Sequence, residues 1–218
     1  MSVRHGPVAV ADYLLCKYVL VPMGYGRPEP TELIERRYRA GEYAFMDTLP
    51  ELGRYAVIAG YVSQLFDAPT ILDLGCGHGR LLQVLRTAPF RRYLGVDISV
   101  EAVEQARSSA PANARFEVAR IEDWTAPERF DVVIFNESLY YMRRPLETFL
   151  RYLDVVSTDG VLIVSIYRRR WARIWKLLER HCHVLDATAV RNRQRQVWDI
   201  KVLRPHGPAR LQGTTAPP

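Results

Sequence analysis

Residues 71–79 read Ile-Leu-Asp-Leu-Gly-Cys-Gly-His-Gly, and the apolar segment 80–85 follows them directly. This pattern predicts a buried strand that ends in an acid, turns through three alternating glycines and restarts as a helix. Glycine permits a positive φ and lets a ligand approach closer than a Cβ allows, and a helix start adds unpaired N–H groups. We therefore expect a ligand to contact bare backbone at this turn.

A second short apolar segment also ends in an acid. Residues 93–98 read Tyr-Leu-Gly-Val-Asp-Ile, which places Asp97 24 positions after Asp73. An acid at the end of the second strand of a βαβ unit is placed to hydrogen-bond a ribose diol. A phosphate at the turn is disfavoured by Asp73 and by the absence of Gly-Lys-Ser/Thr. The G-x-G-x-G spacing also departs from the G-x-G-x-x-G of dinucleotide-binding domains.

Strands and helices alternate strictly after residue 70. Strands are predicted at about 70–74, 93–96, 115–118, 131–135 and 161–167, and helices at about 79–87, 99–109 and 145–156. Right-handed crossovers then give a doubly wound, mostly parallel, Rossmann-like α/β sheet. A basic helix is predicted at 168–180. Two further strands, near 183–186 and at 197–203, bring the predicted number of strands to seven. Because too few residues separate the last two for a crossover, one antiparallel strand is expected near the edge.

Three segments divide the chain. Residues 1–66 are expected to form an N-terminal helical cover, with a loop at 22–30 and helices beginning near residues 31 and 52. Residues 67–204 are expected to form the α/β domain. The tail, residues 205–218, is rich in proline, glycine and threonine, which predicts disorder.

Composition narrows the class of protein. The chain has 218 residues, of which 48% are hydrophobic, and a net charge of +6. Its three cysteines have no C-x-x-C spacing, so neither a disulfide framework nor a zinc site is expected, and a reducing cytoplasm fits. We expect no membrane span and no signal peptide. The net positive charge permits an anionic partner. For the basic residues at 168–176, however, a solvated helix face is favoured over nucleic-acid binding.

Four motifs in order resemble those of class I S-adenosylmethionine-dependent methyltransferases. They are residues 73–79, 95–99, 121–124 and 130–137, and the resemblance covers roughly residues 36–203. Residues 51–55 and 138–141 are most similar to small bacterial natural-product and nodulation-type N-methyltransferases. The resemblance implies an enzyme with S-adenosylmethionine as its cofactor.

The resemblance also implies which residues hold the donor. The backbone of Gly75, Cys76 and Gly77 is expected to face its methionine part, and Asp73 to hold the ammonium. Asp97 is expected to take both ribose hydroxyls, with Ile98 packed on the adenine. Arg54 of the cover could pair with the donor carboxylate, and a solvated Arg54 is the alternative.

One position departs from the family. Arg120 stands where relatives often place an acid that accepts from the adenine amino group, and arginine cannot accept a hydrogen bond. Either Glu122 or Asp123 takes this role, or the backbone of Ile121 reads the adenine alone. A capping role for the two acids is the other interpretation.

The methyl-transfer site is expected after the fourth strand. Asn136 is expected to line it, and a general base is optional, because only an acceptor that must lose a proton requires one. Candidate catalytic residues are Glu137, Tyr140 and His181, with Tyr141 and His183 beside them. Cleft-wall tyrosines and surface histidines are the alternative interpretation.

These patterns predict methyl transfer to an O or N atom of a small natural-product-like metabolite by a monomer or homodimer. The alternatives are an RNA or protein methyltransferase, suggested by the basic charge, and a non-catalytic S-adenosylmethionine-binding protein, suggested by Arg120. The sequence does not name the acceptor.

Overall fold

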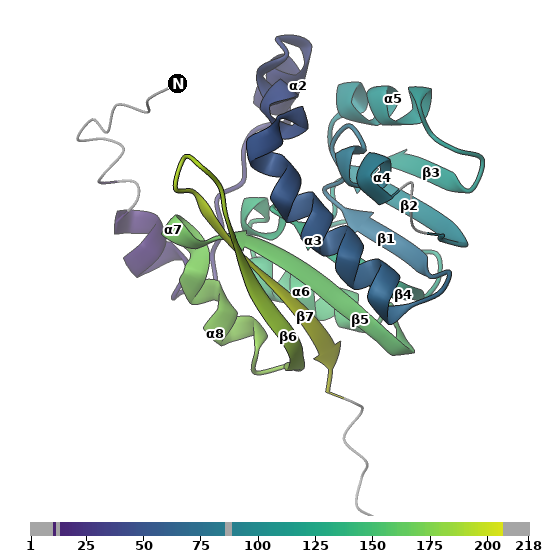
Figure 1. Cartoon of the computed structure of the whole chain (residues 1–218). Coiled ribbons are helices and arrows are strands. Elements are labelled where there is room, and N and C mark those ends of the chain that lie inside the picture. Colours follow the sequence, from purple (N-terminus) through teal and green to yellow (C-terminus); the bar gives the residue numbers. More distant parts are fainter. Residues whose placement is uncertain (1–10, 12–13, 86–88, 207–218) are drawn as a thin grey trace, which may run out of the picture.

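A seven-stranded sheet lies between two layers of helices in the computed structural model, which describes residue 11, residues 14–85 and residues 89–206 (Figure 1). The strand order is β3-β2-β1-β4-β5-β7-β6. The strands are β1 (Thr70–Leu74), β2 (Arg92–Asp97), β3 (Ala114–Val118), β4 (Phe130–Asn136), β5 (Val156–Tyr167), β6 (Cys182–Arg191) and β7 (Val197–Pro205). The first five are parallel, and β7 runs antiparallel to β5 and β6. The predicted doubly wound sheet with one reversed strand is confirmed.

The helices pack on both faces of this sheet. They are α2 (Thr31–Arg39), α3 (Leu49–Leu65), α4 (Arg80–Leu85), α5 (Val100–Ser108), α6 (Pro145–Leu153), α7 (Arg168–Trp171) and α8 (Trp175–Leu178). Shorter turns are the π-helical η1 (Cys16–Leu20) and the 3₁₀ segments η2 (Glu42–Asp47), η3 (Leu139–Tyr141) and η4 (Ala172–Ile174). Among the described residues, no helix is both long and apolar enough to cross a membrane.

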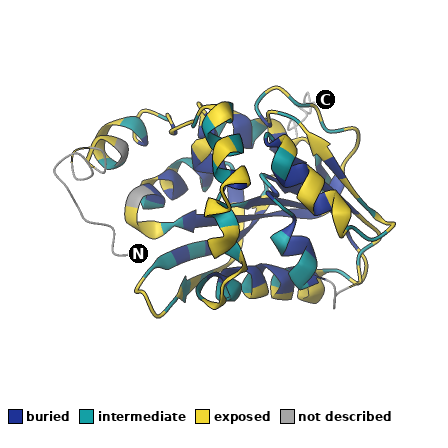
Figure 2. Cartoon of the chain, turned by 90° about the horizontal axis from the view of Figure 1, so that it is seen from above, coloured by how far each residue is buried: buried dark blue, intermediate teal, exposed yellow. Residues whose placement is uncertain are grey.

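Alternation along β1 divides the core into two halves. All five residues of β1 are buried; Ile71 packs with α3, α4 and α5, whereas Leu72 packs with α6 and α8. Figure 2 shows these buried strands between helices whose outer faces are exposed. Each fully buried aliphatic side chain contributes about 1.5–3 kcal/mol relative to exposure, so this double burial holds the centre of the sheet in place.

Local signals explain where the helices begin. In α3, Tyr55, Ile58 and Val62 recur at helical spacing and are buried. Ser99 caps α5, because its Oγ accepts a hydrogen bond from Ala102 N at 3.1 Å. Pro145 stands at the start of α6, where its missing N–H costs nothing.

Three predicted elements and the predicted start of the tail differ from what is observed. The helix expected at 168–180 breaks into α7, η4 and α8. At the first break Trp171 leaves helical geometry (φ −116°, ψ 1°), and its ring stacks on that of Tyr140 with 5.0 Å between the centroids. Strand β6 is longer than predicted, and β5 begins five residues early, with a register shift after Phe130. The tail expected from residue 205 begins after the end of β7, and residues 207–218 lie outside the described part of the chain.

Candidate functional site

A cavity of about 430 Å³ opens at the carboxyl ends of β1, β2 and β4, beneath α2 and η2. Chain order reverses between β1 and β4, and the crevice at such a point is where open α/β sheets bind ligands. Among the predicted site residues, those that line the cavity are Arg54, Asp73, Gly75, Cys76, Gly77, Asp97, Ile98, Ile121, Glu122, Asn136, Glu137 and Tyr140.

Two candidate catalytic residues, His181 and His183, do not line the cavity. His181 follows α8, and its carbonyl accepts a hydrogen bond from His206 N at 3.1 Å. His183 is exposed and its ring meets that of His206. Both histidines lie where β6 starts beside the end of β7, so the strand pair carries them away from the carboxyl ends of β1 and β4. The suggestion that either is catalytic is not supported.

The glycine turn follows β1 and has left-handed backbone geometry. Gly75, Gly77 and Gly79 have φ angles of 83°, 54° and 80°, which favour glycine. A Cβ at Gly75 would overlap the side chain of Ser138, and one at Gly77 would lie 2.8 Å from Tyr38 Oη. The turn therefore leaves bare backbone facing the cavity while Tyr38 of α2 closes over it.

Asp73, the penultimate residue of β1, has one unpaired carboxylate oxygen among the described residues. The hydroxyl of Tyr93 donates to Oδ2, whereas Oδ1 has no hydrogen-bond partner among the described residues although the side chain is only 1% exposed. Burial raises the pKa of Asp73 to about 7. The hydrogen bond from Tyr93 opposes this rise, and the nearby charge of Asp97 adds to it. A buried acceptor of this kind calls for a cationic donor from a ligand.

Asp97 is held rigidly at the end of β2. Its Oδ2 accepts from Gly77 N at 2.9 Å and its Oδ1 from Ser99 N at 3.0 Å. Burial raises the pKa of this carboxyl, while the backbone hydrogen bonds oppose the rise. Each oxygen keeps a further lone pair, so the carboxylate can still accept from two neighbouring hydroxyls.

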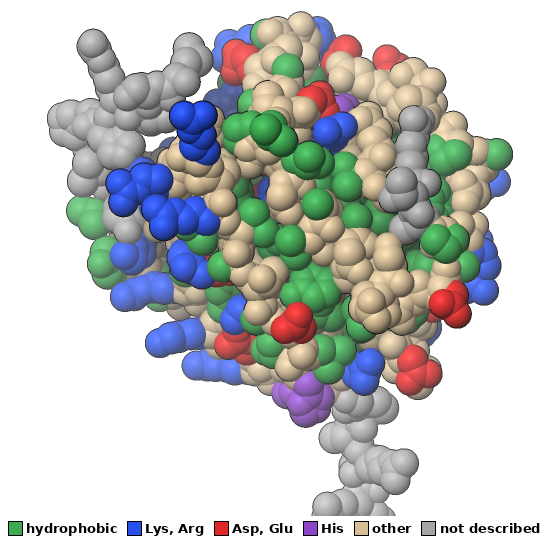
Figure 3. All heavy atoms as spheres, in the orientation of Figure 1, with side chains coloured by type: hydrophobic (Ala, Val, Ile, Leu, Met, Phe, Trp, Pro, Cys, Tyr) green, Lys and Arg blue, Asp and Glu red, His purple; other side chains and the backbone are tan. Residues whose placement is uncertain are grey.

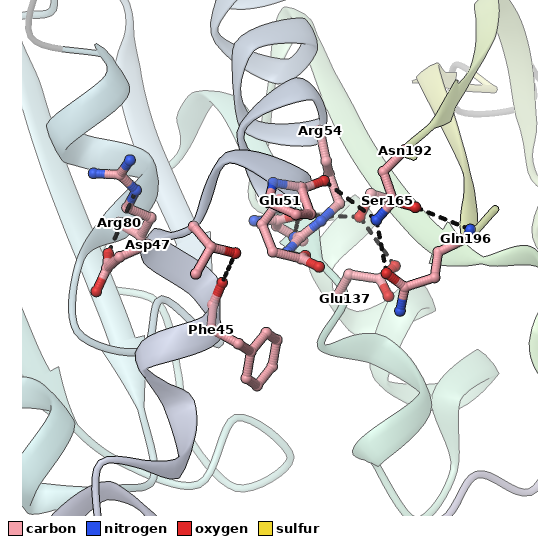
Figure 4. Close-up of polar contacts among 12 residues, drawn as sticks. Phe45, Asp47, Glu51, Arg54, Arg80, Glu137, Ser165, Asn192 and Gln196 are labelled. Carbon is pink, nitrogen blue, oxygen red and sulfur yellow. Dashed lines mark hydrogen bonds and ion pairs between the residues drawn. The ribbon is translucent and has the colours of Figure 1, made fainter. Parts of the chain in front are cut away.

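Arg54 reaches the cavity from the first turns of α3. It donates to Asn136 Oδ1, and its Nη2 lies 2.9 Å from Glu51 Oε2 (Figure 4). Its Nε has no hydrogen-bond partner among the described residues, and the residue is 3% exposed. Although burial opposes the charge, Tyr55, Glu137 and Glu51 raise the pKa of Arg54. The alternative of a solvated Arg54 is therefore wrong.

Glu137 follows β4 in a strained conformation. Its φ of 61° is one of two positive values among the described non-glycine residues and costs about 1–3 kcal/mol. Tyr140 Oη donates to Oε2 at 2.8 Å, and Ser165 Oγ donates to Oε1 at 3.2 Å. Burial raises the pKa of Glu137 to about 7, although Arg54 and these hydrogen bonds oppose it. A carboxyl that titrates near neutral pH can exchange a proton with a ligand.

The segment predicted to read an adenine shows which acid is available. Glu122 lines the cavity, and its Oε1 accepts from Arg143 N at 2.7 Å. Asp123 is exposed and lies 3.8 Å from Arg120, whose Nη2 also donates to Thr31 Oγ1 at 3.3 Å. Glu122 and the backbone at Ile121 therefore remain the candidates at this end.

Several residues at the site escaped sequence reasoning. Glu35 of α2 accepts from Val100 N at 2.6 Å and Ser99 Oγ at 3.1 Å, so the cover caps α5. His78, to which the sequence assigned no role, lies 3.0 Å from Asp47 of η2. Further cavity residues come from the far end of the chain: Tyr167, Gln196 and Trp198. No local pattern signalled them, because the contacts join segments distant in sequence.

The chain resembles known proteins at two levels. A family model described as a methyltransferase domain matches residues 65–201. Trans-aconitate 2-methyltransferase of Escherichia fergusonii is 32% identical over 97 residues, which are 44% of this chain and 38% of that relative. The chain thus matches well under half the length of this curated relative.

Solved structures share the fold. The N-methyltransferase NodS from Bradyrhizobium japonicum WM9, in complex with S-adenosyl-L-homocysteine, has a TM-score of 0.69 at 17% identity, covering 81% of this chain and 98% of NodS. The [4+2]-cyclase SpnF has a TM-score of 0.68 at 13% identity, covering 84% and 99%. The predicted methyltransferase family and its Rossmann-like fold are confirmed.

Proposed function

Since the chain belongs to the methyltransferase domain family, we propose that it transfers a methyl group from S-adenosylmethionine to an O or N atom of a small molecule. The donor, when bound, supplies an electrophilic sulfonium methyl. Asp73 supports this assignment most directly, because its buried Oδ1 lies beside the glycine turn without a partner among the described residues.

The donor half of the cavity fits each part of that cofactor. Asp73 would hold the ammonium, and the backbone at Gly75–Gly77 would face the amino acid part. Asp97 would accept from the ribose hydroxyls, with Ile98 and Ile121 against the adenine. The Nε of Arg54 is available to the carboxylate. Cationic, diol and anionic groups of one ligand would thus meet matching side chains.

The acceptor half is aromatic, with one titrating carboxyl. Tyr140, Tyr141, Tyr167 and Trp198 line it around Glu137. We infer that these rings hold a partly apolar acceptor and exclude water, while Glu137 takes the proton that a hydroxyl or amine loses on methylation. A small-molecule acceptor agrees with the name of the similar trans-aconitate 2-methyltransferase.

Direct assays test this function. Titration calorimetry should detect binding of S-adenosylmethionine and of S-adenosylhomocysteine, and labelled methyl transfer should appear on members of a small hydroxyl and amine panel. Tight binding without transfer to any acceptor would favour a protein that binds the cofactor without methylation. Transfer to RNA, with none to small molecules, would favour the RNA-directed alternative.

Other properties remain proposals. The cytoplasmic location, a place in natural-product biosynthesis and a monomeric or homodimeric state follow from composition and resemblance alone. The division into a cover of residues 1–66 and a domain of residues 67–204 stays a prediction of the same kind. Gel filtration of the purified chain measures the oligomeric state directly.

A further inference from the structure

The positive charge of the chain is concentrated in one segment. Residues 168–206 contain eleven Lys or Arg and three Asp or Glu, a net charge of +8, which exceeds the +6 of the whole chain. Figure 3 shows blue side chains gathered on the flank formed by α7, α8 and the β6–β7 hairpin. The rest of the chain is therefore slightly acidic, and the basic character belongs to this flank.

The tip of the β6–β7 hairpin is a fixed platform beside the cavity. Asn192 Nδ2 donates to Gln196 Oε1 at 2.7 Å and reaches Pro50 O at 3.4 Å, which ties the tip to the start of α3. Gln196 N donates back to Asn192 Oδ1 at 3.0 Å, and Arg195 has a φ of 66°. Figure 4 shows Asn192 and Gln196 on the side of Glu137 opposite Phe45. The tip thus forms one wall of the site.

Three arginines alternate with these structural residues. Arg191, Arg193 and Arg195 are exposed, and no acidic side chain pairs with them in the part of the chain that the structure describes. Elsewhere on the flank, Asp199 lies 2.9 Å from Arg168, and Glu179 pairs with Lys201. The hairpin tip therefore holds guanidinium groups that are available to a ligand.

The cavity begins one residue away from these groups. Gln196, directly after Arg195 in the chain, lines it, as does Trp198 two residues further on. The ring of Tyr167 lies beside that of Trp198, with 6.0 Å between the ring centroids. Guanidinium groups bind carboxylate, sulfonate and phosphate oxygens through paired hydrogen bonds. A ligand seated on the aromatic rings can therefore reach the tip with an anionic end.

We propose that the acceptor is an anionic small molecule, whose acidic group is held by Arg193 and Arg195 while its methyl-accepting atom lies beside Glu137. This proposal rests on the proposed function and adds the class of substrate. A single acidic group is favoured over a long polyanion, because Asp199 and Glu179 neutralise basic residues along the flank.

A matched pair of fluorescent probes tests it. Anilinonaphthalene sulfonate is an aromatic anion, and phenylnaphthylamine has the same rings without the sulfonate. In the double variant R193Q/R195Q, affinity for the sulfonate should fall about threefold to thirtyfold, with affinity for the neutral probe unchanged. The control R180Q/R204Q removes the same charge at the opposite end of the β6–β7 ladder and should change neither affinity.

The outcomes separate the possibilities. Saturating S-adenosylhomocysteine should leave the sulfonate bound, because the donor occupies the other half of the cavity. The proposal would be overturned if R193Q/R195Q lost affinity for both probes equally or for neither, or if the control variant lost as much. Displacement of the sulfonate by S-adenosylhomocysteine would also overturn it. So would stronger competition by a short single-stranded RNA than by pyrophosphate, which would indicate a polyanion. No methyl donor enters these titrations, so a negative result here leaves the methyltransferase proposal standing.

Discussion

Replacing Glu137 by glutamine should make the protein more stable and less active at once. The carboxyl is partly buried at the end of β4 in a strained backbone conformation, and it accepts hydrogen bonds from Tyr140 and Ser165. Glutamine has the same shape, and its oxygen can still accept from Tyr140. The substitution therefore removes the ionisation of this side chain and little else.

The magnitude follows from the pKa of Glu137, which burial raises from 4.5 to about 7. Because the folded-state pKa is raised, the stabilisation is fully present below pH 4.5 and is lost as the pH rises through 7. Relative to low pH, ionisation of Glu137 therefore lowers the free energy of unfolding by about 3 kcal/mol at pH 8 and by about 1 kcal/mol at pH 5. Glu137→Gln should escape this loss.

Urea unfolding at pH 5 and pH 8 measures both values. The stability gain of Glu137→Gln over the natural sequence should grow by about 2–3 kcal/mol between the two pH values. Asp73 and Asp97 remain in both proteins, so the difference isolates Glu137. Glu104→Gln, on the exposed side of α5, removes the same charge and should show no such growth. A gain that does not depend on pH would refute the reasoning.

Activity should move in the opposite direction. If Glu137 removes a proton from the acceptor, its replacement should lower kcat by about 100-fold or more while leaving affinity for S-adenosylhomocysteine unchanged. For the natural sequence, kcat/KM should rise with pH through about 7. Full activity of the variant would leave Glu137 with a purely structural role.

Three further substitutions test the donor half and its cover. Asp97→Ala should weaken S-adenosylhomocysteine binding about tenfold or more in calorimetry, since two charge-assisted hydrogen bonds are lost; unchanged affinity would rule out ribose binding. Gly75→Ala should lower the free energy of unfolding by at least about 2 kcal/mol, because its Cβ overlaps Ser138 at a positive φ, whereas Gly60→Ala in the exposed middle of α3 should raise it by about 0.5–1 kcal/mol. Glu35→Gln should cost about 0.5–1 kcal/mol at low salt and less at high salt, because it removes an acid from the start of α5; a salt-independent change would contradict this.

The sequence was sufficient to bring together the residues of the proposed donor half. Asp73 and Asp97 lie at the carboxyl ends of neighbouring parallel strands, and such strands share their carboxyl edge, so the two acids meet without further information. The three glycines mark positive φ angles that few other residues adopt. Local pattern and topology decide these features, so both can be read from one chain.

The cover and the acceptor half depended on contacts that no local pattern encodes. Glu35 meets the start of α5 across 65 positions, and Asn192 meets Pro50 across 142. Glu137, with its positive φ, and Trp171, at the helix break, both contact Tyr140, and these contacts are set by the tertiary fold. His181 was misplaced for the same reason, since the position of β6 depends on its pairing with β7.

The contact of Glu35 with α5 has a consequence for the speed of the reaction cycle. Because α2 supplies acceptors to Val100 N and Ser99 Oγ, the cover cannot lift from Asp97 without exposing the start of that helix. Such uncapping costs about 1 kcal/mol, which slows departure of the spent nucleoside about fivefold. We therefore expect opening of the cover to slow the exchange of bound S-adenosylhomocysteine, and Glu35→Gln to speed it by a similar factor.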